Sequence, residues 1–131
     1  MIVDCVIIDD EPAAIEVLAG FADRTPNLSL LSSFRDPIQA LSFLRDNKVD
    51  LIFLDINMPG IGGIETARKI LKAETTAKVI VLSVLDDGPI PAHLVQMGVS
   101  GFICKDTGVE QLVRAIQTVL AGDFYLSDKV A

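Results

Sequence analysis

The chain has 131 residues, of which half are hydrophobic and 22% are charged, and these values indicate one folded domain rather than a disordered protein. The formal net charge of −7 argues against nucleic-acid binding by this domain alone, because such binding needs Lys and Arg to neutralise phosphates. The longest apolar runs are as short as strands, and no basic segment precedes an apolar export signal, so we expect a cytoplasmic protein.

Five short apolar segments are the candidate strands. They are rich in Val, Ile and Leu with little polar alternation, a pattern typical of strands buried on both faces of a parallel sheet. Cys5 and Cys104 fall inside two of them, which predicts buried thiols rather than a disulfide or a metal pair. The segments lie at Val3–Ile8, Leu28–Leu31, Leu51–Leu54, Lys78–Leu82 and Gly101–Cys104.

Segments with helical periodicity separate these strands. The first two open with proline in the first turn, and Asp36 supplies the second with a typical N-cap side chain. Gly122 follows the last helix as a typical C-cap. We expect helices from about Pro12 to Ala22, Pro37 to Asp46, Ile64 to Leu71, Gly88 to Met97 (the weakest pattern) and Leu112 to Leu120.

This order of elements predicts a strand–helix unit repeated five times, which makes a doubly wound three-layer sandwich around a parallel sheet. Residues 1–124 form the predicted domain, and residues 125–131, which turn polar, are expected to be a C-terminal tail or the start of a linker. Ligands of such sheets bind beyond the carboxyl ends of the strands, where the strand order reverses. The residues at those ends are therefore the candidates for function.

Acidic residues end the first and third candidate strands, at Asp9, Asp10 and Asp55. If these strands are neighbours, the carboxylates converge, and they cannot all stay ionised without a compensating charge. A divalent cation would supply that charge, and oxygen ligands suit Mg²⁺. Each carboxylate taken alone could instead be a helix cap or a turn residue.

Ser83 ends the fourth candidate strand and Lys105 follows the fifth. A hydroxyl and an ammonium group are suitable neighbours for a phosphoryl group, although each residue alone would be an ordinary strand-end or surface residue. The second strand ends at Phe34-Arg35 and offers no comparable group.

The segments "VIIDDEP", "LIFLDINMPG" and "GFICKD", together with Ser83, resemble the receiver domain of two-component response regulators. The resemblance covers nearly the whole chain, and the motifs follow in order at the ends of the expected strands. It implies a flavodoxin-like (βα)5 fold with the strand order 2-1-3-4-5.

The resemblance also implies a role for each acidic residue. Asp55 would accept a phosphoryl group from a sensor histidine kinase. Asp10, Asp55 and the backbone carbonyl of Asn57 would hold Mg²⁺, and Asp9 would act through a metal-bound water. Self-phosphotransfer and autodephosphorylation are the only activities expected, which argues against, but does not exclude, a role as an enzyme.

Four further residues take roles from the same resemblance. Lys105 would bind the phosphoryl group, Ser83 would move toward it as a switch hydroxyl, and Phe102 would change rotamer with Ser83. Val84 stands where the family usually has a smaller residue, and we expect it to narrow access to the site.

The output would be a change on the face made by the fourth helix, the fifth strand and the fifth helix, which commonly forms homodimers in the family. The segment "LAGDFYLSDKV" resembles NarL/FixJ-type receivers with a LuxR-type DNA-binding domain, whereas "IDDEPAAIEVL" resembles receivers with a LytTR-type domain. A transcriptional output would need such an effector domain, which these 131 residues do not include, and no membrane partner is expected.

Two alternatives stay open. A stand-alone or degenerate receiver could act by protein–protein interaction. A phosphatase of the haloacid dehalogenase type also carries an aspartate nucleophile after a buried strand, but it needs a second aspartate two residues on as a general acid. This chain has Asn57 there, which argues against the phosphatase.

Overall fold

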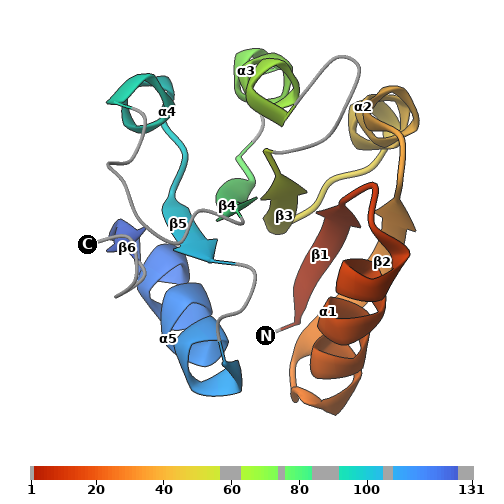
Figure 1. The fold of residues 1–131 in the computed structure, drawn as a ribbon, viewed down its shortest axis with the longest axis vertical. Coiled ribbons are helices and arrows are strands. Elements are labelled where there is room, and N and C mark those ends of the chain that lie inside the picture. Colours follow the sequence, from red (N-terminus) through yellow and green to blue (C-terminus); the bar gives the residue numbers. More distant parts are fainter. Residues whose placement is uncertain (1, 57–62, 74–75, 84–91, 105–107, 127–131) are drawn as a thin grey trace.

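The computed structural model describes residues 2–56, 63–73, 76–83, 92–104 and 108–126, and strands alternate with helices along the chain (Figure 1). The strands are β1 (Val3–Ile8), β2 (Leu28–Phe34), β3 (Leu51–Asp55), β4 (Lys78–Ser83), β5 (Gly101–Cys104) and β6 (Tyr125–Leu126). The helices are α1 (Pro12–Arg24), α2 (Pro37–Asp46), α3 (Gly63–Lys72), α4 (Ala92–Met97) and α5 (Val109–Leu120).

All strands belong to one parallel sheet in the order β2-β1-β3-β4-β5-β6. Helices α2, α3 and α4 cover one face of the sheet, and α1 and α5 cover the other (Figure 1). The predicted doubly wound sandwich and its strand order are confirmed, with β6 added beside β5. The chain leaves β1 toward β2 and then crosses to β3 on the other side of β1, so the order reverses between β1 and β3.

The central strands are apolar throughout because both faces of the sheet are covered. Val6 and Ile8 of β1 pack in the cluster beneath α2, α3 and α4, whereas Cys5 and Ile7 pack in the cluster beneath α1 and α5. Burial of these alternating side chains on opposite faces is the main favourable contribution to folding. It also holds β1 and β3 rigidly side by side under the candidate site.

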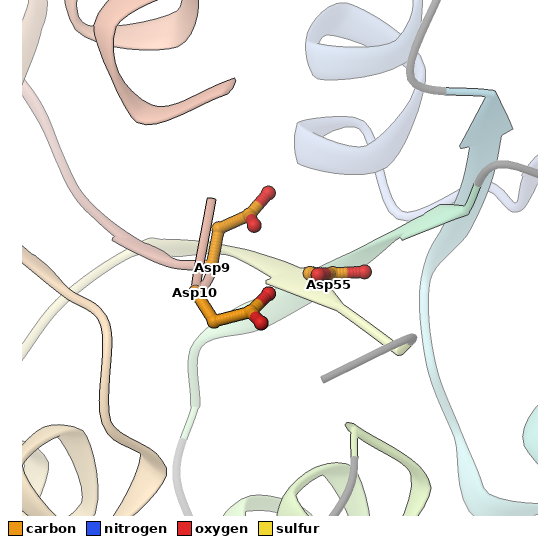
Figure 2. Close-up of side chains that lie close together, drawn as sticks. All are labelled: Asp9, Asp10 and Asp55. Carbon is orange, nitrogen blue, oxygen red and sulfur yellow. The ribbon is translucent and has the colours of Figure 1, made fainter. Parts of the chain in front are cut away.

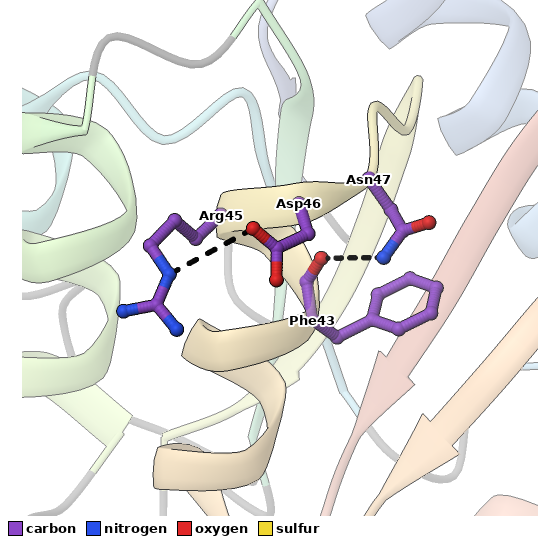
Figure 3. Close-up of polar contacts among 4 residues, drawn as sticks. All are labelled: Phe43, Arg45, Asp46 and Asn47. Atoms are coloured by element: carbon purple, nitrogen blue, oxygen red, sulfur yellow. Dashed lines mark hydrogen bonds and ion pairs between the residues drawn. The ribbon is translucent and has the colours of Figure 1, made fainter.

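Side chains cap both ends of α2. The Oδ1 atom of Asp36 accepts a hydrogen bond of 3.0 Å from the backbone N–H two residues on, as expected for an N-cap. At the other end, Nδ2 of Asn47 donates to the backbone oxygen of Phe43 at 2.9 Å (Figure 3). The neighbouring ion pair between Arg45 and Asp46 spans 3.9 Å between exposed side chains, so it adds little stability.

Helix α5 packs on the sheet through a stripe of buried side chains. The stripe consists of Leu112, Ala115, Ile116 and Val119, whereas Leu120 at the end of the helix is 36% exposed. Ala121 is the C-cap of α5, and Gly122 follows it with a φ of 94° and donates its N–H to the oxygen of Val119 at 3.0 Å, so the predicted glycine terminates the helix one residue beyond the cap. Within the described ranges, no helix is long and apolar enough to cross a membrane.

Strand β2 is longer than predicted and carries a β-bulge. Its pairing with β1 skips Leu31, because Cys5 pairs with Leu30 and the next residue of β1 pairs with Ser32. The bulge shifts the phase of the strand, so Leu30 packs on the α1 side while Phe34 packs on the α2 side. A strict two-residue alternation would have put both side chains on one face.

A C-terminal tail or linker was expected from residue 125 onward. Residues 125 and 126 instead form β6 and extend the sheet. The N–H of Tyr125 donates to the oxygen of Ser100 at 3.1 Å, and Tyr125 pairs with Gly101. Gly101 suits this close pairing because an added Cβ would lie 3.2 Å from Val119 and 3.4 Å from Ile80. The domain boundary itself stays a prediction.

Both cysteines are buried thiols, as predicted. Burial, with a smaller contribution from the Asp4 carboxylate, raises the pKa of the Cys5 thiol to about 11. The thiol therefore stays protonated near neutral pH, which fits a packing role in the core.

Candidate metal and phosphoryl site

The register of the sheet brings the first and third strands to a common edge. Ile8 of β1 pairs with Leu54 of β3, so Asp9 and Asp55 follow next to each other at the carboxyl ends of these strands. Both carboxylates are buried, with 0% and 1% of the residue exposed. The N–H of Asp9 donates to the oxygen of Phe34 at 2.9 Å, which fixes the end of β1 against β2.

The turn between β1 and α1 is organised by Asp9. Its Oδ1 atom accepts a hydrogen bond of 2.9 Å from the N–H of Glu11, the residue that precedes the first turn of α1. Asp9 therefore helps to organise the start of α1, as considered from the sequence, although Glu11 occupies the N-cap position itself. This turn also sets the direction of Asp10, which lies between them.

The carboxylates of Asp9, Asp10 and Asp55 converge, as predicted. One oxygen from each lies within 4.8 Å of the others, and Figure 2 shows the side chains gathered where β1 and β3 end. Asp10 is partly exposed, so the cluster opens to solvent on its side. Asp55 comes from a central strand that is buried along its whole length.

These donors fit Mg²⁺. Ligand oxygens of an octahedral Mg²⁺ lie about 2 Å from the ion, so opposite ligands are about 4 Å apart. The oxygens of the cluster all lie within 4.8 Å of one another, which is only slightly more. Three carboxylates are hard, anionic ligands of the type this ion prefers, and the open side leaves room for water molecules. The geometry therefore suits a hydrated divalent cation shared by β1 and β3.

Two further predicted residues lie on the neighbouring strands. Ser83 is the buried last residue of β4 and pairs in register with Cys104 of β5. Phe102 of β5 is fully buried in the cluster that includes Leu94 of α4. Ser83 therefore lies at the carboxyl edge of the sheet, and Phe102 lies on the face that α4 covers.

Asn57, Val84 and Lys105 lie outside the described residues. Their roles stay predictions from the sequence. The same holds for the first part of the fourth helix as expected from the sequence, from Gly88 to Pro91.

The end of β2 offered no comparable functional group from its sequence, whereas the structure places Arg35 beside the acidic cluster. Arg35 directly follows β2, and its Nε donates to the backbone oxygen of Asp10 at 3.3 Å. The two residues are 25 positions apart, and no motif marks the contact. Only the position of Arg35 at a strand end could have indicated it.

A doubly wound parallel sheet with an acidic cluster at its switch point defines a flavodoxin-like protein with a candidate site for a divalent cation. The chain belongs to the response regulator receiver domain family, whose family model matches residues 5–117. This confirms the resemblance found in the sequence.

Curated relatives agree with this assignment. The response regulator GacA of Pseudomonas aeruginosa is 41% identical over 91 residues, which cover 70% of this chain and 42% of the relative. The response regulator UvrY of Escherichia coli K12 is 28% identical over 129 residues, which cover 98% of this chain and 59% of the relative. The chain thus spans about half the length of the curated relatives it matches.

Solved structures share the fold. A two-component response regulator of the LuxR family from an Aurantimonas species has a TM-score of 0.87 at 25% identity, covering 99% of this chain and 93% of that chain. The isolated receiver domain of RcsB from Salmonella enterica has a TM-score of 0.86 at 19% identity, covering 99% and 96%. The sequence similarity to LuxR-type receivers is supported, whereas no relative named here is described as a LytTR-type regulator.

Proposed function

We propose that this receiver domain is a phosphorylation switch in which Asp55 accepts a phosphoryl group from a sensor histidine kinase. The observation that carries the proposal is the convergence of Asp9, Asp10 and Asp55 at the end of two adjacent central strands. Asp10 and Asp55 would hold Mg²⁺ directly, and Asp9 would bind it through water. The backbone carbonyl of Asn57 is the further ligand expected from the family.

Phosphoryl transfer to a carboxylate depends more on the surroundings of the nucleophile than on its intrinsic reactivity. A carboxylate is a weak nucleophile, so phosphoryl transfer depends on its position and on neutralisation of the transferring group. A bound Mg²⁺ would supply that neutralisation. The rigid strand β3 fixes Asp55, and the turn held by Asp9 fixes Asp10, so little reorganisation is needed when the donor arrives.

Phosphorylation of Asp55 would then change the neighbouring strands. The new negative charge and acceptor oxygens attract hydrogen-bond donors, of which Ser83 on β4 and Lys105 after β5 are the expected ones. Movement of Ser83 would leave space that Phe102 enters by a change of rotamer. The altered surface of α4, β5 and α5 would favour a homodimer and control the output.

We further infer a transcriptional output through a LuxR-type effector domain. The relatives are response regulators of which this chain spans about half, and one structural neighbour is described as a LuxR-family regulator. DNA would be bound by that effector domain, and the receiver would act in the cytoplasm, where a kinase and DNA are both accessible.

The test is intact-mass spectrometry after incubation with acetyl phosphate and Mg²⁺. The wild-type protein should gain one phosphoryl group, and Asp55→Asn should gain none. Asp50→Asn is the matched control, because Asp50 is an exposed carboxylate that immediately precedes the same strand. Asp10→Asn should retain the acceptor but label slowly, because it removes a metal ligand.

The outcomes separate the candidate functions. Labelling of Asp55→Asn at the wild-type rate would refute the assignment of the acceptor. Failure of the wild-type protein to label, or to bind beryllofluoride with Mg²⁺, would instead favour a degenerate receiver that acts by protein–protein interaction. Turnover of a phosphate ester, abolished by Asp55→Asn, would be needed to revive the phosphatase alternative.

A further inference from the structure

Arg35 connects the end of β2 to the acidic cluster. Its Nε donates to the backbone oxygen of Asp10 across 3.3 Å, while the backbone oxygen of Phe34, the preceding residue, accepts from the N–H of Asp9 at 2.9 Å. Two consecutive residues of β2 and its following turn therefore hold the two consecutive aspartates of the site. The side chain of Arg35 is exposed, so a substitution there should not disturb the core.

Arg35 brings a positive charge next to the acidic cluster of a negatively charged protein. The chain carries a formal net charge of −7, and three carboxylates meet at the carboxyl edge of the sheet. Within the part of the chain that the structure describes, Arg35 is the one basic residue that directly follows the carboxyl end of a strand. Its contact is with the backbone of Asp10, and it makes no ion pair with a described carboxylate.

We propose that Arg35 is a charge-balancing residue that partly substitutes for the cation in the metal-free site. It lowers the repulsion among Asp9, Asp10 and Asp55, and it thereby weakens the affinity of the site for Mg²⁺. This inference rests on the proposed metal site and extends it to a residue that does not bind the ion.

The physical argument is electrostatic. A residue's carbonyl oxygen and its carboxylate are a few ångströms apart, so the guanidinium lies within about 10 Å of the cluster. At that range its charge repels a divalent cation when the Debye length is long, and this repulsion fades as salt is added. We therefore expect loss of the charge to tighten Mg²⁺ binding about threefold at low ionic strength.

A purely structural role predicts the opposite. If Arg35 only held the backbone of Asp10, its removal would misplace a ligand and weaken Mg²⁺ binding, with little dependence on salt. Lysine would then be as harmful as glutamine, because it lacks the planar group that reaches the carbonyl oxygen through Nε. The sign of the change and its salt dependence distinguish the two roles.

The experiment is calorimetric titration of the whole chain with Mg²⁺, at about 10 mM and about 1 M ionic strength, since the Debye lengths are about 30 Å and 3 Å. The variants are Arg35→Gln, Arg35→Lys and the matched control Arg45→Gln, which removes the same charge from an exposed site at the end of α2. Metal-free thermal unfolding in EDTA is recorded for each protein as a second measurement.

We expect Arg35→Gln to bind Mg²⁺ about threefold tighter than the wild type at low ionic strength and equally at high ionic strength. Arg35→Lys and Arg45→Gln should bind like the wild type, and only Arg35→Gln should unfold at a lower temperature in EDTA. Weaker or unchanged binding by Arg35→Gln at low ionic strength, or a change that persists at high ionic strength, would overturn the inference. If the wild type and all variants fail to bind Mg²⁺, the proposed metal site fails, and the inference fails with it.

Discussion

Removal of the Asp10 charge should make the metal-free protein more stable. Asp10, Asp9 and Asp55 each place an oxygen within 4.8 Å of the others, so the folded state concentrates negative charge that the unfolded chain disperses. The substitution Asp10→Asn keeps the size and hydrogen-bonding capacity of the side chain but removes its charge. No side-chain hydrogen bond of Asp10 is lost among the described residues, so the effect should be electrostatic.

The magnitude follows from the separation. Coulomb's law gives about 0.9 kcal/mol for two like charges 4.8 Å apart with the dielectric constant of water, and Asp10 faces two such neighbours. Burial of Asp9 and Asp55 increases this repulsion, whereas Arg35 and counter-ions reduce it. We expect a gain of about 1–2 kcal/mol in the free energy of unfolding, or about 4–8 °C in the midpoint of thermal unfolding.

The assay is thermal and urea unfolding in EDTA at low ionic strength, followed by far-ultraviolet circular dichroism because the chain has no tryptophan. Asp123→Asn is the matched control, since it makes the same change of charge at an exposed turn after α5. Addition of Mg²⁺ should stabilise the wild type more than Asp10→Asn and so reduce the difference between them. The reasoning is refuted if Asp10→Asn is no more stable than Asp123→Asn, or if its advantage is the same in about 1 M salt.

Three further predictions concern the scaffold. The free energy of unfolding should fall by about 1–2 kcal/mol between pH 9 and 11, because the unfolded chain ionises the Cys5 thiol near its ordinary pKa of 9.0 while the folded protein holds it protonated to about 11. Cys5→Ala should lose this part of the pH dependence, and parallel pH profiles for the two proteins would contradict it. Asn27 has a φ of 70°, so Asn27→Ala should cost about 1 kcal/mol in urea unfolding while Asn27→Gly should cost nothing; equal losses would refute a backbone origin. Asp36→Ala should cost about 1 kcal/mol through loss of the N-cap of α2, whereas Asp36→Asn should behave like the wild type.

The site was largely predictable because its residues end recognisable strands. Apolar runs covered on both faces are easy to identify, and their last residues must share one edge when the strands are parallel. Asp9 and Asp55 could therefore be placed together before any contact was known. The family's strand order, rather than composition or periodicity, put β1 beside β3 and made the prediction definite.

The edges of the sheet were less predictable, for two physical reasons. Strand β2 contains a bulge at Leu31, and a reading based on alternation cannot detect the extra residue that turns Phe34 to the opposite face. Strand β6 has two residues, too few for any periodic pattern. Its position depends on the close approach of Tyr125 to Gly101, a contact between distant parts of the chain.

Arg35 was missed because its effect does not depend on a motif. A side chain that donates to a backbone oxygen 25 residues away leaves no pattern in the sequence, and an exposed arginine is the ordinary expectation for a loop. Its importance comes from the charge of the site it adjoins. The same contact beside neutral residues would contribute only one weak, solvent-exposed hydrogen bond.

Affinity for a cation and stability without it must oppose each other in this site. The repulsion among Asp9, Asp10 and Asp55 destabilises the metal-free fold, and a bound cation relieves that repulsion on binding. Asp10→Asn lowers the repulsion and should weaken Mg²⁺ binding, whereas Arg35→Gln raises it and should strengthen binding. The two variants should therefore shift metal-free stability in opposite directions, and in each the shift in Mg²⁺ affinity should have the reverse sign. If metal-free stability and Mg²⁺ affinity both rise or both fall in either variant, side-chain geometry rather than charge governs the site.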